Sequence, residues 1–164
     1  MSALIKEKTC AFSGHRILSK NFDENELKNA INALIAEDTD TFLVGMALGF
    51  DTVCFKVLEK IRELYPIKIV ACVPCADQYK FFNKKQKAEY DRMLASADEV
   101  INLSKTYYDG CMFDRNKFMV DNCSALIAYL NFNRGGTYQT VRYAVENNVK
   151  VIYIPEGRIQ KDGS

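Results

Sequence analysis

Residues 41–73, TFLVGMALGFDTVCFKVLEKIRELYPIKIVACV, contain one complete strand–helix–strand unit. The apolar run at 41–44 predicts a strand that ends at Gly45. Apolar side chains then recur at helical spacing from Phe50 to Leu64, and Pro66 ends that helix. Residues 67–73 read as a buried strand of the kind found inside parallel sheets. Two strands joined through a helix predict a parallel pair with a right-handed crossover.

The same alternation of periods covers the rest of the chain. Further strands are predicted at 8–13, 99–103, 125–130 and 149–154, and further helices at 23–37, 84–97, 113–122 and 137–147. This alternation predicts an α/β fold, a single Rossmann-like domain over residues 1–155 whose mainly parallel sheet of about six strands has helices on both faces. The order 3-2-1-4-5-6 is the default for such a doubly wound sheet. Residues 156–164 are predicted to be a polar tail.

The composition limits the class of protein. The 164 residues include 22 basic and 21 acidic side chains, for a formal net charge of +1, and 48% of them are hydrophobic. This content supports one packed core and excludes an intrinsically disordered chain. No run approaches the ~18 apolar residues of a membrane span, and residues 3–5 are too short for a signal-peptide core, so we expect a cytoplasmic protein. The near-neutral charge argues against a nucleic-acid partner.

The cysteines are expected to be reduced core residues rather than ligands or redox groups. They are Cys10, Cys54, Cys72, Cys75, Cys111 and Cys123. Cys72 and Cys75 form a close pair, but a structural zinc site needs a second such pair, and a redox motif opens a helix rather than ending a strand. We therefore predict no metal site and no required cofactor.

Polar and glycine residues collect directly after the predicted strands. The carboxyl ends of parallel strands share one edge of the sheet, which is where ligands bind in such folds. Glycine-containing turns precede the helices at 50 and 137, and a turn of this kind presents backbone N–H groups and the positive end of a helix dipole. These turns favour a phosphate-bearing ligand, with charge supplied by Arg16 and Arg115. Neither turn is a GxGxxG fingerprint or a Walker P-loop.

Each of these features also has a purely structural interpretation. Glycines after strands serve tight turns without any ligand. Asp51 can complement the first turn of its helix, and His15, the single histidine, can brace its loop. The aromatic residues near the strand ends can stack on a base or pack as core and subunit contacts; they are Tyr79, Phe81, Phe82, Tyr107 and Tyr108.

Five of these segments together resemble the SLOG superfamily, which unites DNA-processing protein A, the Lonely Guy phosphoribohydrolases and the small bacterial YpsA-like proteins. They are FSGHR at 12–16, GMALGFD at 45–51, PCADQ at 74–78, RN at 115–116 and GGT at 135–137. The resemblance is strongest to the YpsA-like branch and covers nearly the whole chain. It implies a nucleotide or nucleotide-derived ligand at the strand ends, and a homodimer, because relatives commonly dimerise.

The Lonely Guy enzymes cleave the glycosidic bond of nucleoside monophosphates, and their motifs are only partly present. Met112 and Arg115 match the first motif, and Gly136 and Thr137 match the Gly-Thr of the second. Thr140 stands where that second motif places a glutamate. Because a threonine cannot stabilise an oxocarbenium-like state or activate a water as a carboxylate does, hydrolysis becomes the alternative, with Arg115 as its candidate residue.

The leading hypothesis is a binding or sensing module for a nucleotide-like ligand, without a catalytic residue. The expected ligand-binding residues are Gly14, His15, Arg16, Gly45, Met46, Ala47, Gly49, Asp51, Pro74, Asp77, Gln78, Arg115, Asn116, Arg134, Gly135, Gly136, Thr137 and Thr140. The likeness of 45–51 to the turn of DNA-processing protein A would imply single-stranded DNA. The lysines near Phe81 and Phe82 are better explained as the solvated face of a helix.

Overall fold

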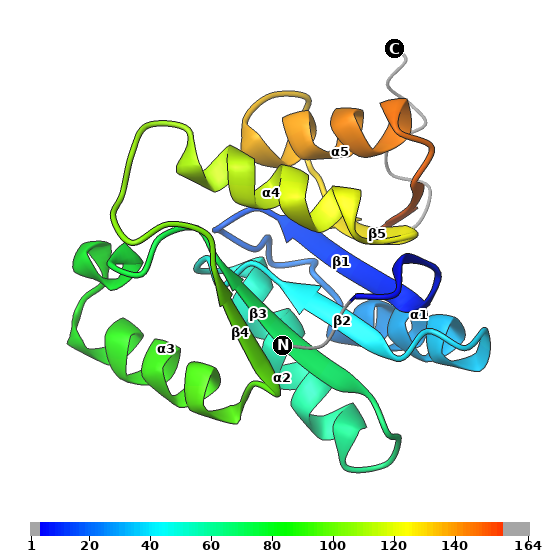
Figure 1. Cartoon of the computed structure of the whole chain (residues 1–164). Helices are drawn as coiled ribbons and strands as arrows, with labels where there is room; N and C mark the ends of the chain where they lie inside the picture. Colours follow the sequence, from blue (N-terminus) through cyan, green and yellow to red (C-terminus); the bar gives the residue numbers. More distant parts are fainter. Residues whose placement is uncertain (1–3, 156–164) are drawn as a thin grey trace.

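The computed structural model describes residues 4–155 and contains a six-stranded, all-parallel sheet in the order β4-β3-β2-β1-β5-β6 (Figure 1). The strands are β1 (Thr9–Gly14), β2 (Thr41–Val44), β3 (Lys68–Val73), β4 (Glu99–Asn102), β5 (Ala125–Tyr129) and β6 (Lys150–Tyr153). The predicted α/β, Rossmann-like fold is thus confirmed. The predicted polar tail lies outside the described residues.

Helices cover both faces of the sheet, as predicted. They are α1 (Glu24–Ala36), α2 (Phe50–Arg62), α3 (Lys84–Ser96), α4 (Cys111–Asp121) and α5 (Gly136–Glu146), and short 3₁₀ turns occupy Lys6–Lys8 and Gln78–Phe81. Figure 1 shows α1, α2 and α3 on one side of the sheet and α4 and α5 on the other. Right-handed crossovers explain this division, because the chain adds strands in one direction through α3 and in the other direction from α4 onward.

The default strand order was wrong in one respect. The order 3-2-1-4-5-6 places the reversal after the third strand, whereas here β4 continues past β3 and the reversal comes after the fourth strand. The neighbouring strands at the reversal are therefore β1 and β5, which pair from Cys10 with Ala125 to Gly14 with Tyr129. Ligands of doubly wound sheets bind in a crevice outside the strand ends at which the order reverses, and these are here the carboxyl ends of β1 and β5.

The sheet separates two apolar layers. In β3, Ile69, Ala71 and Val73 pack toward the side of α1, α2 and α3, while Val70 and Cys72 pack toward the side of α4 and α5. Because successive strand residues point to opposite faces, both sets must be apolar when helices cover both faces. All six cysteines are buried free thiols, in agreement with the sequence-based expectation.

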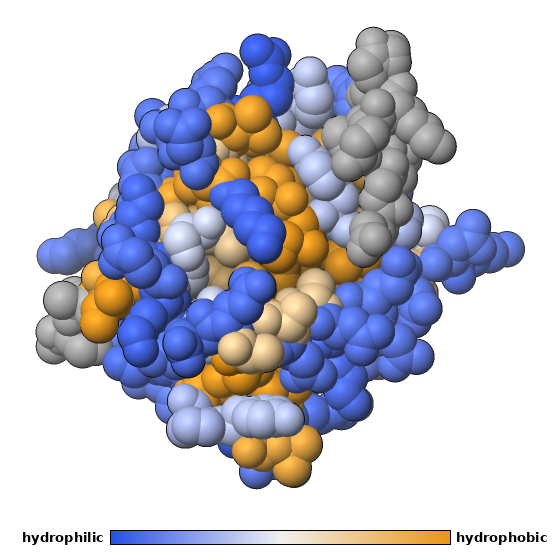
Figure 2. Space-filling view, turned by 90° about the vertical axis from the view of Figure 1, so that its right-hand side faces the viewer, coloured by the Kyte–Doolittle hydropathy of each residue, from blue (hydrophilic) through white to orange (hydrophobic). Residues whose placement is uncertain are grey.

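The edge strand β6 leaves one side of the molecule partly apolar. A hollow of about 360 Å³ lies between α1 and β6 and is lined in part by Ala30, Ala33, Ile152 and Ile154. Figure 2 shows apolar surface exposed on this side of the molecule. Within residues 4–155, none of the helices has the length and apolar character needed to cross a membrane.

Candidate ligand-binding site at the carboxyl edge of the sheet

His15 joins the two strand ends at which the sheet order reverses. Its backbone carbonyl accepts a hydrogen bond from the Phe50 N–H (3.1 Å), at the start of α2. Its ring Nε2 accepts a hydrogen bond from the Asn131 N–H (2.9 Å), just after β5. The ring of His15 also stacks on Phe132, with centroids 4.3 Å apart and planes inclined by 10°. His15 thus braces the loops around the crevice, which is the structural role that the sequence left open for it.

The 45–51 turn is held by side chains from several elements. The Arg115 guanidinium of α4 donates through Nη1 to the Gly45 carbonyl. Gln78 donates through Nε2 to the Met46 carbonyl (2.8 Å), and the Ala47 N–H donates to Oδ2 of Asp51 (3.0 Å). Consecutive backbone groups at 45, 46 and 47 are therefore each bonded to a buried side chain. The turn forms a firm wall of the crevice.

Asp51 and Arg115 form a buried, electrostatically linked pair beneath this wall. Their residues are only 7% and 4% exposed. Burial raises the pKa of the Asp51 carboxyl from 3.8 to about 6, although the Arg115 charge and the Ala47 N–H act in the opposite direction. Burial likewise lowers the pKa of the Arg115 guanidinium, and the Asp51 charge opposes that change. Arg115 therefore supports the turn, a role additional to the ligand contact predicted for it.

The glycines in and next to the 45–51 turn are required because other protein atoms pack closely against them. A Cβ on Gly45 would lie 2.9 Å from Cζ of Arg115. A Cβ on Gly14 would collide with the Phe50 ring, and one on Gly49 would collide with the Arg16 carbonyl. Gly49 also has φ of +87°, a left-handed conformation that L side chains rarely adopt. These glycines are thus explained without any ligand.

The 135–137 turn, unlike the 45–51 turn, is not packed against other parts of the protein at its glycines. Gly135 and Gly136 are exposed, and a Cβ built on either meets nothing within 4 Å. The φ of +91° explains the choice of glycine at 135, but Gly136 begins α5 without such a requirement. The cap residue of α5, Gly135, has no side chain with which to cap the start of the helix. The first backbone N–H groups of a helix have no partner within the helix, and an exposed helix start of this kind can bind an anion.

Phe132 and Arg134 lie between the open turn and His15. The Phe132 side chain is stacked on His15, and the Arg134 guanidinium lies 5.2 Å from the Phe132 ring centroid. Phe132 remains 46% exposed. Planar groups therefore follow one another beside the start of α5, and Arg134 brings a positive charge to it.

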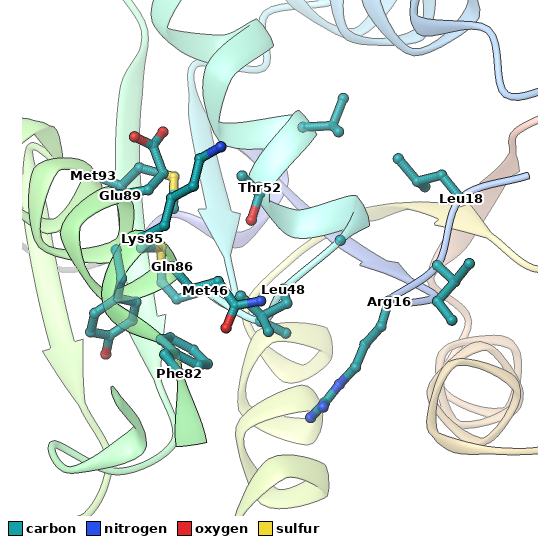
Figure 3. Close-up of a pocket in the computed structure, with 15 residues that line it drawn as sticks. Arg16, Leu18, Met46, Leu48, Thr52, Phe82, Lys85, Gln86, Glu89 and Met93 are labelled. Atoms are coloured by element: carbon teal, nitrogen blue, oxygen red, sulfur yellow. The ribbon is translucent and has the colours of Figure 1, made fainter. Parts of the chain in front are cut away.

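A groove of about 560 Å³ extends from the 45–51 turn toward α3. Four of the predicted residues line it, namely Arg16, Met46, Ala47 and Gly49. Figure 3 shows Arg16 and Leu18 on one side of this groove and Phe82 and Met93 of the α3 region on the other. The α3 residues that line it are Lys85, Gln86, Glu89, Tyr90 and Met93. The sequence does not assign Tyr90 and Met93 to the site, because their helical spacing is equally typical of core positions.

The remaining predicted residues lie either near the 45–51 turn or in α5, and those near the turn have partners within the protein. Pro74 and Gln78 are buried beside the 45–51 turn, and Asp77 pairs with Lys80 (2.9 Å), an interaction that lowers the pKa of the Asp77 carboxyl. Asn116 accepts a hydrogen bond from Nε of Arg115 (2.8 Å) through Oδ1.

On the other side of the crevice, Thr137 and Thr140 are buried in α5. Thr140 Oγ1 donates to the Gly136 carbonyl (2.8 Å), a bond within the helix. Within residues 4–155 no group of three or more histidine, cysteine or carboxylate side chains could hold a metal ion.

The parallel sheet, with glycine turns leading from its carboxyl edge into helices, is that of a Rossmann-like protein. Within that class the chain belongs to the YpsA family: a family described as "YspA SLOG family" matches residues 19–154. The resemblance that the strand-end motifs indicated is confirmed.

Two relatives from Bacillus subtilis illustrate the relationship. The uncharacterized SPbeta prophage-derived protein YoqJ is 28% identical over 135 residues, which are 74% of this chain and 79% of YoqJ. The UPF0398 protein YpsA is 24% identical over 114 residues, covering 68% of this chain and 63% of that protein. The chain therefore matches most, but not all, of the length of these relatives.

Two solved structures share the fold. DNA processing protein A from Streptococcus pneumoniae superposes with a TM-score of 0.64 at 19% identity, covering 90% of this chain and 50% of that one. The Helicobacter pylori protein of the same name, described for its single-stranded DNA binding mode, gives a TM-score of 0.63 at 13% identity and covers 90% and 65%. At these identities the similarity establishes the fold alone.

Proposed function

We propose that this protein binds a small, phosphate-bearing, nucleotide-like ligand at the carboxyl edge of its sheet and acts as a binding or sensing module. The ligand phosphate contacts the N–H groups at the start of α5, with Arg16 and Arg134 contributing charge. The 45–51 turn forms the facing wall. Membership in a SLOG family supports a nucleotide-related module of this kind.

The observation that carries the proposal is the open start of α5. Gly136 is exposed, has space around it, and has no packing reason to be glycine. A backbone that a ligand approaches closely is a common reason for glycine at such a position. The turn also follows β5, next to the point where the strand order reverses, so fold and local geometry indicate the same place.

Thermal unfolding of the purified protein with AMP, ADP, cyclic nucleotides, ADP-ribose and NAD tests the proposal. A ligand at ~100 times its dissociation constant stabilises the folded state by about 2.7 kcal/mol. For a domain of this size, that raises the unfolding temperature by about 5–10 °C. Adenosine, which lacks the phosphate, is expected to give a much smaller shift. No shift with any of the phosphate compounds contradicts the proposal.

The matched variants Gly136→Asp and Gly136→Ala locate the phosphate. Aspartate places a carboxylate at the position proposed for the phosphate, which favours the helix but repels the ligand. Alanine keeps the backbone N–H groups and adds only a methyl group where there is space. We expect Gly136→Asp to abolish the ligand-induced shift and Gly136→Ala to reduce it far less. Equal shifts in both variants contradict a phosphate at this helix start.

A second candidate function is hydrolysis of nucleoside monophosphates at the glycosidic bond. The observation in its favour is Asp51, whose pKa of about 6 is that of a carboxylic acid able to exchange protons near neutral pH. Burial and the bond to Ala47 limit its access to a substrate. Release of free base during incubation with nucleoside monophosphates, lost in Asp51→Asn, establishes this function; intact nucleotide after prolonged incubation excludes it.

An oligonucleotide titration separates these functions from DNA binding. The expectation from the near-neutral charge is that a labelled single-stranded oligonucleotide binds weakly and does not compete with the nucleotide. Tight binding that competes with AMP instead makes the strand-edge site a nucleic-acid site, as the described DNA binding of the Helicobacter pylori protein would imply.

A further inference from the structure

We infer that the groove between α2 and α3 holds the base of the ligand, so that the preferred ligand is a nucleoside phosphate rather than a sugar phosphate or an inorganic anion. This inference rests on the proposed function and adds the part of the site that distinguishes one phosphate compound from another. It assigns a ligand contact to side chains of α3 that the strand-end motifs do not include.

The groove has the size and the lining of a small-molecule site. Its volume of about 560 Å³ lies within the range of roughly 300–1,000 Å³ that is usual for such sites. Met46, Tyr90 and Met93 are each at most 3% exposed and form its apolar floor. Methionine side chains adapt to the shape of a planar group, and an aromatic ring favours stacked or edge-on contacts with it.

Phe82 supplies an aromatic wall near the opening. It is half-buried and packs edge-on against Tyr90, with ring centroids 5.2 Å apart and an angle of 78° between the planes. Figure 3 shows Phe82 across the groove from Arg16, with Leu48 between them and Thr52 on the neighbouring part of α2. A flat heteroaromatic ring entering the groove therefore meets an aromatic ring on one side and aliphatic side chains of the 45–51 turn and α2 on the other.

The backbone of the 45–51 turn is strained where it lines the groove. Met46 has φ of +64°, a conformation uncommon for a residue other than glycine. The bond from Gln78 Nε2 to the Met46 carbonyl holds it there (2.8 Å). Strain that the surrounding structure maintains is typical of ligand-contacting residues. The Met46 side chain is buried in the floor of the groove.

The charge at the opening of the groove is positive. Glu89, the acid of its lining, is already paired with Arg92 (2.9 Å) and Lys56 (3.6 Å), and Arg92 lowers the pKa of the Glu89 carboxyl. Arg16 and Lys85 are exposed, and neither pairs with a carboxylate among residues 4–155. The opening is therefore complementary to an anion, while the floor is complementary to an apolar, planar group.

A nucleoside phosphate combines these properties in one molecule. Arg16 lines the groove, and the adjacent His15 binds the loop that leads to the start of α5. In the proposed complex the base lies in the groove and the phosphate extends past Arg16 toward α5. A sugar phosphate has no group that uses the apolar floor.

Isothermal titration with the four common nucleoside 5′-monophosphates and with ribose 5-phosphate tests the inference. At least one nucleotide is expected to bind about tenfold or more tightly than ribose 5-phosphate, which is the discrimination available from an apolar pocket. Equal affinities for ribose 5-phosphate and all four nucleotides overturn the inference but leave the phosphate site intact. Binding of none of the five compounds overturns the proposed function as well.

The variant Thr52→Phe places a ring in the groove, and Lys60→Phe on the same helix is its control. Thr52 lines the groove, whereas Lys60 is exposed and lies outside its lining. We expect Thr52→Phe to lower nucleotide affinity to that of ribose 5-phosphate and to leave ribose 5-phosphate binding within about twofold, and Lys60→Phe to change neither. Unchanged nucleotide affinity in Thr52→Phe, or an equal loss for both compounds, overturns the inference.

The milder variant Phe82→Leu removes the aromatic wall and keeps an apolar side chain of similar reach. A several-fold loss of nucleotide affinity, with ribose 5-phosphate unaffected, is the expected result. It provides the same comparison if Thr52→Phe fails to fold. Unchanged nucleotide affinity in Phe82→Leu counts against a base in the groove.

Discussion

The 45–51 turn and the 135–137 turn both join a strand to a helix at the carboxyl edge of the sheet, but only in the first do other protein atoms pack closely against the glycines. Arg115, Gln78 and Asp51 bond the backbone of the 45–51 turn, and its glycines face other protein atoms. The 135–137 turn is exposed and its glycines face open space. A glycine turn before a helix can therefore serve the fold or leave room for a ligand, and its neighbours decide which.

The largest expected effect comes from removing the support of the 45–51 turn. Arg115→Met deletes the bond to the Gly45 carbonyl and leaves the Asp51 carboxyl buried without its nearby cation. Leaving a buried carbonyl without its donor and a buried carboxylate without charge compensation costs about 3–5 kcal/mol, so we expect a loss of that size in the free energy of unfolding in urea. A loss below about 1 kcal/mol accompanied by weaker nucleotide binding would instead make Arg115 mainly a ligand contact.

A somewhat smaller effect on the free energy of unfolding is expected when the pH changes, because the Asp51 carboxyl next to the 45–51 turn titrates. The pKa of Asp51 is raised from 3.8 to about 6, so the folded state holds a proton that the unfolded state releases. Its contribution to stability is fully present below pH ~4 and is lost as the pH rises through ~6, a change of about 3 kcal/mol.

The variant Asp51→Asn isolates this contribution, because asparagine keeps an oxygen that accepts from the Ala47 N–H. Urea unfolding of both proteins from pH 3.5 to 7 should show the native protein losing stability relative to the variant between pH ~4 and ~6. Parallel pH curves for the two proteins contradict a raised pKa at Asp51.

The smallest expected effect has the opposite sign and comes from the open turn. Gly136→Ala adds a methyl group where nothing lies within 4 Å and reduces the freedom of the unfolded chain. We expect a gain of about 0.4–1 kcal/mol in the free energy of unfolding.

The corresponding change in the closed turn is Gly49→Ala, at φ of +87° and against the Arg16 carbonyl. It is expected to destabilise the protein by about 1–2 kcal/mol from the backbone conformation alone, with the collision adding to that loss. Changes of the same sign at 49 and 136 contradict the contrast between the two turns.

Much of the fold was predictable because the two periodicities of the chain report local backbone structure. The strands at 41–44 and 125–130 and the helix at 84–97 agree with the structure to within a residue or so. The strand order was not predictable in the same way, because the position of β4 beyond β3 depends on pairing between segments that are distant in the sequence.

The sequence predicted which strand-end residues form the candidate site. It did not predict which of them face a ligand and which support the fold. The sequence motif of Gly45, Gly49 and Asp51 is identical whether these residues contact a ligand or contact other parts of the protein, such as Arg115. The α3 wall of the groove was missed because Tyr90 and Met93 have the spacing of core residues, and in the structure they are buried and form part of the floor of the groove.

The α/β class, the places where strands end, and the family follow from the amino-acid sequence alone, because they depend on local periodicity and on motifs in order along the chain. The meeting of β1 and β5, the support of one glycine turn by Arg115 and the openness of the other turn depend on tertiary packing. The physical reason is that a hydrogen bond or a collision depends on atoms that packing brings together. The spacing of residues along the chain does not reveal that Arg115 lies against Gly45.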